Sequence, residues 1–175
     1  MKSLAVANRG EIACRIFRTA RRLGIRTIAL FSEADRHSRH VREADSSICI
    51  GPPAARESYL HIERVVAAAR EMGADAVHPG YGFLSENPLF AQACVDAGLV
   101  FVGPPPQVMS AMASKLAAKA RMRAAGIPVL PGYEGALQDL EELERQAQAI
   151  GLPLMIKPAA GGGGKGMRVV KASLS

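Results

Sequence analysis

A glycine-rich segment near the end of the chain has the residue types that bind phosphate. Residues 160–166 read Ala-Gly-Gly-Gly-Gly-Lys-Gly and lie between two apolar runs, 153–156 and 167–170. Glycines permit positive φ and let backbone N–H groups approach an anion, and Lys157 and Lys165 add positive charge. The sequence therefore predicts a strand–loop–strand flap that covers a phosphate group.

Three phosphate-binding motifs compete for this segment. A Walker A loop would need Gly at position 159 and Ser or Thr at position 166, where the chain has Ala159 and Gly166. Gly161, Gly163 and Gly166 spell GxGxxG, but a strand follows them where a dinucleotide fingerprint opens a helix. A protein-kinase loop would place its valine at Arg168, and no catalytic loop follows. A flexible linker of small residues is the remaining alternative.

A second candidate site is the loop His78-Pro79-Gly80-Tyr81-Gly82, which directly follows a short apolar strand. Open α/β sheets bind ligands at the carboxyl ends of their strands, so this loop is well placed for binding. The alternative is that the loop only shapes a turn and that His78 is a core histidine.

Basic residues and cysteines bear on partners and compartment. Arg15, Arg18 and Arg22 have helical spacing, which fits either a subunit interface or a solvated basic face. The three cysteines, Cys14, Cys49 and Cys94, form no CxxC or Cys/His cluster and are expected to be reduced thiols in a cytosol-like compartment.

Composition excludes several classes of protein. The chain has 175 residues, 49% of them hydrophobic and 22% charged, as in a globular protein with a core. No apolar run reaches the roughly 18–20 residues that cross a bilayer, and polar residues interrupt the N-terminus before a signal-peptide core could form. The net charge is +6, but no nucleic-acid motif accompanies the arginines. We therefore expect a cytoplasmic protein that binds neither membrane nor nucleic acid.

The elements that position these residues alternate along the first hundred residues. Short apolar strands are expected at 3–7, 27–31, 47–50, 76–78 and 99–102, with helices after most of them. Continuous apolar strands alternating with helices predict an α/β domain with a doubly wound, mainly parallel sheet. The segment between the second and third strands is expected to be a polar turn.

The sequence pattern changes from alternating strands and helices to mainly helical after the proline cluster at 104–106. A helical stretch over 108–125 is followed by a helix over 140–150 and by the two strands of the flap, at 153–156 and 167–170. The expected organisation is thus a domain over 1–103, a helical connector over 104–130 and an incomplete lid over 131–175.

Four motifs carry a resemblance to a known family. The segments 7–13 (ANRGEIA), 78–87 (HPGYGFLSEN), 101–104 (FVGP) and 157–170 (KPAAGGGGKGMRVV) closely resemble the biotin carboxylase component of biotin-dependent carboxylases. The resemblance runs through the whole chain in order. The stretch 114–135 is more similar to the acyl-CoA carboxylase branch, methylcrotonyl- or geranyl-CoA carboxylase.

The resemblance implies a fold and an activity. It implies a pre-ATP-grasp domain followed by the start of an ATP-grasp lid, in an enzyme that uses ATP and Mg²⁺ to activate bicarbonate and then carboxylates biotin held on a carrier domain. A carboxyltransferase subunit would be a further partner. The ATP-binding residues implied by the resemblance are Lys115, Lys157, Gly161, Gly162, Gly163, Gly164, Lys165, Gly166 and Met167.

The resemblance also places Tyr81 and Gly82 near the biotin site, and Arg15 and Arg18 in a homodimer interface. Arg22 stands where some relatives have an acid, and this departure weakens the interface assignment.

The resemblance assigns no catalytic or metal-ligating residue to this chain. No Asp or Glu follows Glu144, so the carboxylates that Mg²⁺ requires, together with the general base, are expected in a C-terminal lobe. The chain alone is therefore expected to be inactive. Two alternatives stay open at this point: another ATP-grasp ligase of the carbamoyl-phosphate synthetase type, or a non-catalytic binding or assembly module.

Overall fold

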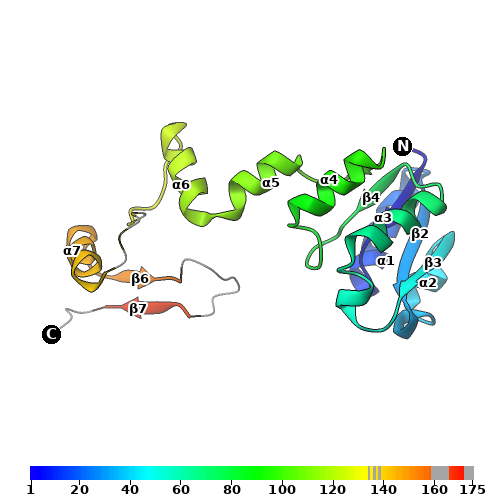
Figure 1. Ribbon diagram of the computed structural model, residues 1–175, viewed down its shortest axis with the longest axis horizontal. Helices are drawn as coiled ribbons and strands as arrows, with labels where there is room; N and C mark the ends of the chain where they lie inside the picture. The colour runs from blue at the N-terminus through cyan, green and yellow to red at the C-terminus, as the bar shows by residue number, and fades with distance from the viewer. Residues whose placement is uncertain (134, 136, 138, 159–165, 172–175) are drawn as a thin grey trace. The chain divides into compact units, whose positions relative to one another are not determined.

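The computed structural model describes residues 1–133, 135, 137, 139–158 and 166–171 (Figure 1). The chain divides into two compact units, Met1–Ser110 and Ala111–Ser175. The first contains a five-stranded sheet and the second a two-stranded one. No helix in the described part of the chain is long and apolar enough to cross a membrane.

The sheet of the first unit has the strand order β3-β2-β1-β4-β5, and every described pairing in it is parallel. Its strands are β1 (Ser3–Val6), β2 (Arg26–Ser32), β3 (Ser46–Gly51), β4 (Ala76–His78) and β5 (Val100–Phe101). β1 is the central strand, because Leu4 lies opposite Thr27 of β2 on one side and Ala76 of β4 on the other. The predicted parallel α/β sheet is confirmed.

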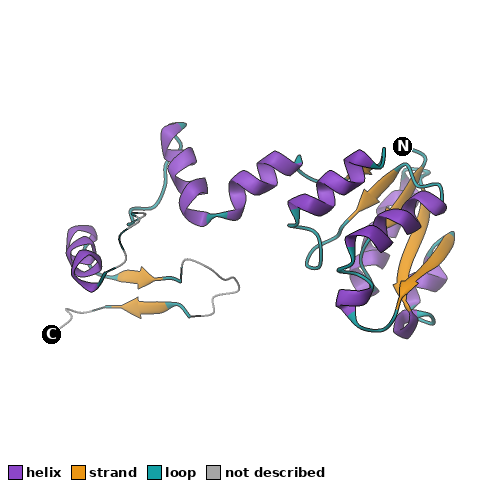
Figure 2. Cartoon of the chain, viewed as in Figure 1, coloured by secondary structure: helices purple, strands orange, loops and turns teal. Residues whose placement is uncertain are grey.

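Both faces of this sheet are covered, which explains why its strands are continuously apolar. Ala5 and Leu30 share one buried cluster with Val65 of α3 and Phe90 of α4. On the opposite face, Val6 and Ala29 pack against α1. The helices that cover the two faces are α1 (Gly10–Arg22), α2 (Arg39–Glu43), α3 (Ile62–Glu71) and α4 (Pro88–Asp96), as Figure 2 shows.

The helix ends follow from local chemistry. Asn87 caps α4, since its side-chain oxygen accepts hydrogen bonds from the N–H groups of Leu89 and Phe90, and Pro88 fills the first helical position. Gly24, just after α1, has a φ of +68°, a backbone conformation that favours glycine and ends the helix.

The polar segment between β2 and β3 is more structured than a turn. It contains a 3₁₀ turn, η1 (Glu33–Asp35), and the helix α2, whose His40 is fully buried. A second 3₁₀ turn, η2 (Ala55–Glu57), precedes α3. The turn prediction was wrong here because five helical residues with one buried side chain give no detectable periodicity.

The expected helical stretch over 108–125 consists of two helices, α5 (Pro106–Ala113) and α6 (Lys115–Ala124). The break falls at Ser114, which has extended backbone and caps α6 by accepting a hydrogen bond from the N–H of Ala117. After α6, the second unit contains α7 (Leu140–Ile150) and the antiparallel pair β6 (Leu154–Ile156) and β7 (Arg168–Val170). The two strands predicted at 153–156 and 167–170 are therefore confirmed as an antiparallel pair, and residues 159–165 between them lie outside the described residues.

Candidate functional site

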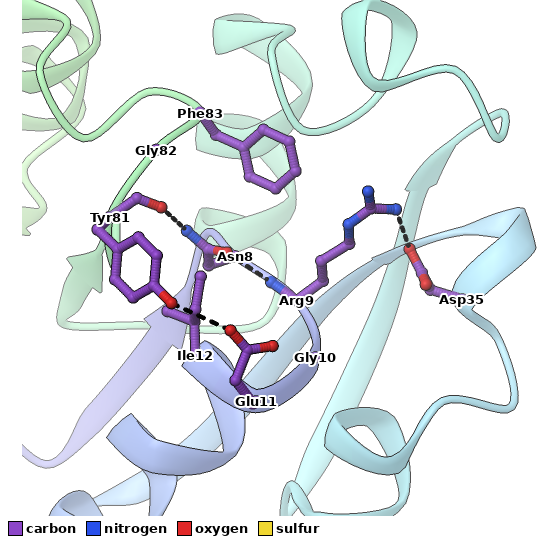
Figure 3. Close-up of a pocket in the computed structure, with 9 residues that line it drawn as sticks. All are labelled: Asn8, Arg9, Gly10, Glu11, Ile12, Asp35, Tyr81, Gly82 and Phe83. Carbon is purple, nitrogen blue, oxygen red and sulfur yellow. Dashed lines mark hydrogen bonds and ion pairs between the residues drawn. The ribbon is translucent and has the colours of Figure 1, made fainter. Parts of the chain in front are cut away.

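A pocket of about 380 Å³ opens at the carboxyl ends of β1 and β4. At β1 the strand order reverses, because β2 lies on one side of it and β4 on the other. Open α/β sheets bind ligands at such a switch point. The residues that line the pocket are Asn8, Arg9, Gly10, Glu11, Ile12, Asp35, Tyr81, Gly82 and Phe83 (Figure 3).

Asn8 joins the two loops that form the pocket. Its amide nitrogen donates hydrogen bonds to the carbonyl oxygens of Pro79 and Tyr81, both at 2.8 Å, and its amide oxygen accepts one from the N–H of Arg9 at 3.0 Å. The Asn8 side chain is buried, so these hydrogen bonds satisfy polar groups that water cannot reach. Asn8 therefore fixes the β4–α4 loop against the start of α1.

The close approach of these two loops requires glycine at position 80. A Cβ atom there would lie 2.7 Å from both the Asn8 amide nitrogen and the Ile12 side chain, and Gly80 has a φ of +67°. Such a position excludes any L side chain on two separate grounds, contact and backbone conformation. The glycine in the HPGYGF motif is thus explained by packing against Asn8.

Arg9 and Asp35 form the far side of the pocket. The Arg9 guanidinium lies 3.4 Å from the Asp35 carboxylate and 5.5–5.6 Å from the ring centres of Phe83 and Tyr59, which stack on each other. Asp35 also accepts hydrogen bonds from the Tyr59 hydroxyl at 2.8 Å and from the Ser32 hydroxyl at 3.0 Å. Burial favours a raised pKa for Asp35, but these hydrogen bonds and the Arg9 charge outweigh it and lower the pKa. The carboxylate therefore stays ionised and holds Arg9 in place.

Tyr81 and Glu11 meet at the mouth of the pocket. The Tyr81 hydroxyl donates a hydrogen bond to a carboxylate oxygen of Glu11 at 3.0 Å, while 66% of the Tyr81 surface remains exposed (Figure 3). The hydrogen bond to Glu11 raises the pKa of Tyr81. Glu11 lies in the first turn of α1, where the helix dipole favours a negative charge.

Two histidines support the loops from behind. The Nδ1 atom of His78 accepts a hydrogen bond from the N–H of Gly80 at 3.0 Å, and the Nδ1 atom of His40 accepts one from the N–H of Gly10 at 3.4 Å. Burial lowers the pKa of both imidazoles. Both therefore act as neutral acceptors at neutral pH. The alternative of a core histidine describes His78 only in part, because this side chain is half-buried.

The structure brings only some of the predicted site residues together. Tyr81 and Gly82 lie in the pocket, and Arg15 and Arg18 lie on the exposed face of α1. In the second unit, Lys157 is exposed just after β6.

The other predicted nucleotide-binding residues are described in part. Gly166 is exposed and has a φ of +75°, and Met167 is half-buried just before β7. The run Gly161–Lys165 lies outside the described residues, and of Lys115 only the backbone, as the first residue of α6, is described.

Sequence reasoning missed the roles of Asn8, Glu11 and Asp35. Asn8 and Glu11 belong to a motif that was used only as a family signature, and their contacts involve residues about 70 positions away. Asp35 lay in the segment interpreted as a turn. An acid shortly after the second strand of such a sheet was the signal that could have drawn attention to Asp35.

Magnesium does not fit the part of the chain that the structure describes. Within those residues, no group of three or more His, Cys, Asp or Glu side chains could hold a metal ion. The carboxylate of Asp35 is occupied by Arg9, Tyr59 and Ser32, and that of Glu11 by Tyr81.

Two family models match the chain in order. Residues 1–109 match the biotin carboxylase N-terminal domain, and residues 114–174 match the ATP binding domain of the carbamoyl-phosphate synthase L chain. The first match covers the whole sheet and pocket described above. It favours biotin carboxylase over a carbamoyl-phosphate synthetase, although the second model bears the latter's name.

Whole-chain comparisons agree with the first model. The chain is 57% identical over 171 residues to the mitochondrial methylcrotonoyl-CoA carboxylase subunit alpha of Oryza sativa, covering 98% of this chain and 23% of that protein. It is also similar to the Campylobacter jejuni biotin carboxylase–β,γ-ATP complex, with 48% identity and a TM-score of 0.89 over 98% of this chain and 38% of that one.

A third similar structure is the biotin carboxylase domain dimer of Hydrogenobacter thermophilus 2-oxoglutarate carboxylase, in complex with MgADP, ADP and bicarbonate. It is 45% identical, with a TM-score of 0.85 over 97% of this chain and 37% of that one. The chain thus spans between about a quarter and two fifths of the length of these relatives. From the match over residues 1–109 and these similarities, the chain belongs to the biotin carboxylase N-terminal domain family.

Proposed function

We propose that this chain is the N-terminal part of an ATP-dependent biotin carboxylase, which uses ATP and bicarbonate to carboxylate biotin held on a carrier domain. ADP and phosphate are the other products, and the reaction is the first half of acyl-CoA carboxylation. The single observation that carries the proposal is the 48% identity and TM-score of 0.89, over 98% of the chain, to the Campylobacter jejuni biotin carboxylase–β,γ-ATP complex.

The proposal divides the work between segments. Residues 1–103 are the pre-ATP-grasp domain, 104–130 a helical connector and 131–175 an incomplete ATP-grasp lid. Lys157 and the loop that joins β6 to β7 contact the nucleotide, because lysines and backbone N–H groups offset polyphosphate charge. Tyr81 contacts biotin, which its exposed position on the switch-point pocket supports.

Lys157 offers a direct test in the full-length protein that carries this chain. Replacing it by alanine removes a positive charge from the nucleotide, so the KM for ATP in bicarbonate- and biotin-dependent hydrolysis is expected to rise roughly tenfold. Lys171, an equally exposed lysine just after β7, is the matched control, and its replacement by alanine should leave that KM unchanged. A full-length protein whose ATP hydrolysis ignores biotin would overturn the proposal in favour of another ligase or a binding module.

The 175-residue chain alone should not turn over. Calorimetric titration with MgATP is expected to show millimolar binding or none, since no carboxylate cluster for the metal lies among the described residues. Bicarbonate-dependent ATP hydrolysis by this chain at enzyme-like rates, stimulated by free biotin, would contradict the assignment of the catalytic groups to a C-terminal lobe.

The proposed partners are a biotin carboxyl carrier domain, a carboxyltransferase subunit and a second copy of the chain. The high identity to a methylcrotonoyl-CoA carboxylase subunit supports an acyl-CoA of that branch as the final acceptor. The homodimer would use Arg15 and Arg18 on the exposed face of α1. Light scattering should show a dimer that the double change Arg15→Glu, Arg18→Glu dissociates and that Arg70→Glu, on α3, does not. A monomeric parent protein would contradict this interface.

The proposed location is the cytoplasm, supported by three cysteines that are all free thiols. The rice relative is named as mitochondrial, so imaging of a tagged full-length protein against a mitochondrial marker decides between the two. Coincidence with the marker would contradict the cytoplasmic assignment.

A further inference from the structure

The loop that carries Tyr81 is held in an unusual backbone conformation. Gly80, Gly82 and Phe83 all have positive φ, at +67°, +69° and +41°. Phe83 is the informative one, because a residue with a bulky side chain rarely adopts this conformation unless its surroundings impose it. Strained positions of this kind gather at sites where a loop must present a group in one fixed place.

The contacts that impose this conformation lie on both sides of Tyr81. Before it, the carbonyl of Pro79 is held by the Asn8 amide. After it, the Phe83 ring is stacked on Tyr59 at 5.0 Å between ring centres, with the Arg9 guanidinium beside both. The Tyr81 backbone is therefore fixed.

The Tyr81 side chain has no comparable packing. Two thirds of its surface is exposed, and the hydrogen bond from its hydroxyl to Glu11 is what ties the ring to the protein. Glu11 comes from a different segment, the first turn of α1, and its carboxylate faces the phenol across the pocket mouth (Figure 3). Without that carboxylate, the ring would be free to turn about χ1 into solvent.

We propose that Glu11 is a positioning residue that holds the Tyr81 hydroxyl over the pocket and makes it a hydrogen-bond acceptor toward the ligand. An ionised carboxylate only accepts hydrogen bonds, so the Tyr81 hydroxyl must be the donor and its single O–H is used by Glu11. The Tyr81 oxygen is then left as an acceptor, so it suits a ligand that offers an N–H or O–H donor. The ureido group of biotin has this chemistry; the inference rests on the proposed function.

The test uses the full-length protein and a double-mutant comparison. If Glu11 acts through Tyr81, then Glu11→Ala and Tyr81→Phe each raise the KM for free biotin by roughly three- to tenfold, the range that one net hydrogen bond is worth. The double variant should lose no more than either single one, because both changes remove the same contact. The KM for ATP should stay unchanged in all three. Glu11→Gln keeps an acceptor oxygen and should stay within about twofold of the parent.

Glu63 supplies a matched control. Like Glu11 it is an exposed acid at the second position of its helix, α3, but it lies on another part of the unit and outside the pocket. Glu63→Ala therefore repeats the loss of a helix-terminal charge without touching Tyr81, and the biotin KM should be unchanged. An additive double variant, or an equal effect of Glu63→Ala, would overturn the positioning role.

A second measurement needs no turnover. In the 175-residue chain labelled with ¹³C at tyrosine Cζ, the Tyr81 signal, assigned with Tyr81→Phe, should titrate at a lower pH in Glu11→Ala than in the parent. Glu63→Ala should not change it. An unshifted titration would overturn the contact itself. A parent enzyme without biotin-dependent hydrolysis would instead overturn the proposed function, even if the NMR contact is present.

Discussion

Asn8 and Asn87 use opposite ends of the same amide, and this difference predicts opposite results for the same substitution. Asn8 joins the two loops through its nitrogen, which donates to two carbonyl oxygens, each at 2.8 Å, while its oxygen accepts from the N–H of the adjacent Arg9. Asn87 works through its oxygen, which accepts from two N–H groups at 2.9 and 3.2 Å. Replacing each by aspartate exchanges nitrogen for oxygen at nearly constant shape. In Asn8→Asp a carboxylate oxygen then faces two carbonyl oxygens, whereas Asn87→Asp keeps the oxygen that accepts both hydrogen bonds.

The magnitude follows from counting the contacts. Asn8→Asp loses two hydrogen bonds at roughly 0.5–1.5 kcal/mol each and leaves a buried acceptor pair facing a carboxylate, at about 1–3 kcal/mol more. The expected fall in the free energy of unfolding is therefore about 2–6 kcal/mol. Asn87→Asp should change it by less than about 0.5 kcal/mol, because Asp and Asn are equally good N-caps.

Urea denaturation of the 175-residue chain, followed by far-ultraviolet circular dichroism, measures both changes. The opposing carbonyls raise the pKa of the new carboxyl in folded Asn8→Asp, so its deficit should be smaller at pH 5 than at pH 7.5. If Asn8→Asp leaves too little folded protein to measure, Asn8→Ala should lose roughly 1–3 kcal/mol. Equal midpoints for the parent and Asn8→Asp, or an Asn87→Asp as unstable as Asn8→Asp, would refute the reasoning.

Three further outcomes follow from the same unit. Gly80→Ala should lower the free energy of unfolding by about 2–5 kcal/mol through backbone strain and overpacking. Gly82→Ala, which has open space around its Cβ, should lower it only by the roughly 1–2 kcal/mol of backbone strain. Similar urea midpoints for the two variants would contradict this. Because burial lowers the pKa of His40, the folded state binds its proton less well than the unfolded chain, so stability should be full above roughly pH 6.5 and fall as the pH drops below it. His40→Asn keeps a hydrogen-bond acceptor, so the urea midpoint of this variant should change less between pH 5 and pH 7 than that of the parent. An equal change of the midpoint with pH in both proteins would count against His40. Burial raises the pKa of Cys94 to about 12, so iodoacetamide at pH 8 should alkylate the half-buried Cys49 first, and peptide mass spectrometry showing equal rates would contradict the buried thiol.

Much of the fold could be predicted because the signals were local. Short continuous apolar runs marked the strands, and their alternation with helical segments predicted a parallel sheet with covered faces. The segment around His40 failed for the opposite reason, since a helix of five residues has too few turns to show a buried face. Ser114 looked like an ordinary helical residue because its capping role depends on backbone geometry at that one position.

The site was predictable in place but not in its contacts. The position of Tyr81 after a buried strand pointed to the carboxyl edge of the sheet, where the pocket lies. The pairings of Tyr81 with Glu11 and of Asn8 with Pro79 depend on which strands become neighbours. Strand order depends on the whole chain, so it cannot be predicted from the residues that surround Asn8 or Tyr81 in the sequence.

The hydrogen bonds of Asn8 span 71 and 73 residues of chain, and this separation has a consequence for synthesis. β1 pairs with β2 early, but its other edge stays open until β4 has left the ribosome. During that interval a buried strand presents unpaired backbone groups to other nascent chains. Closure by β4 covers this edge and completes the pocket in one event. A pause in synthesis before β4 has emerged should therefore promote aggregation, and the same step that ends this risk forms the site.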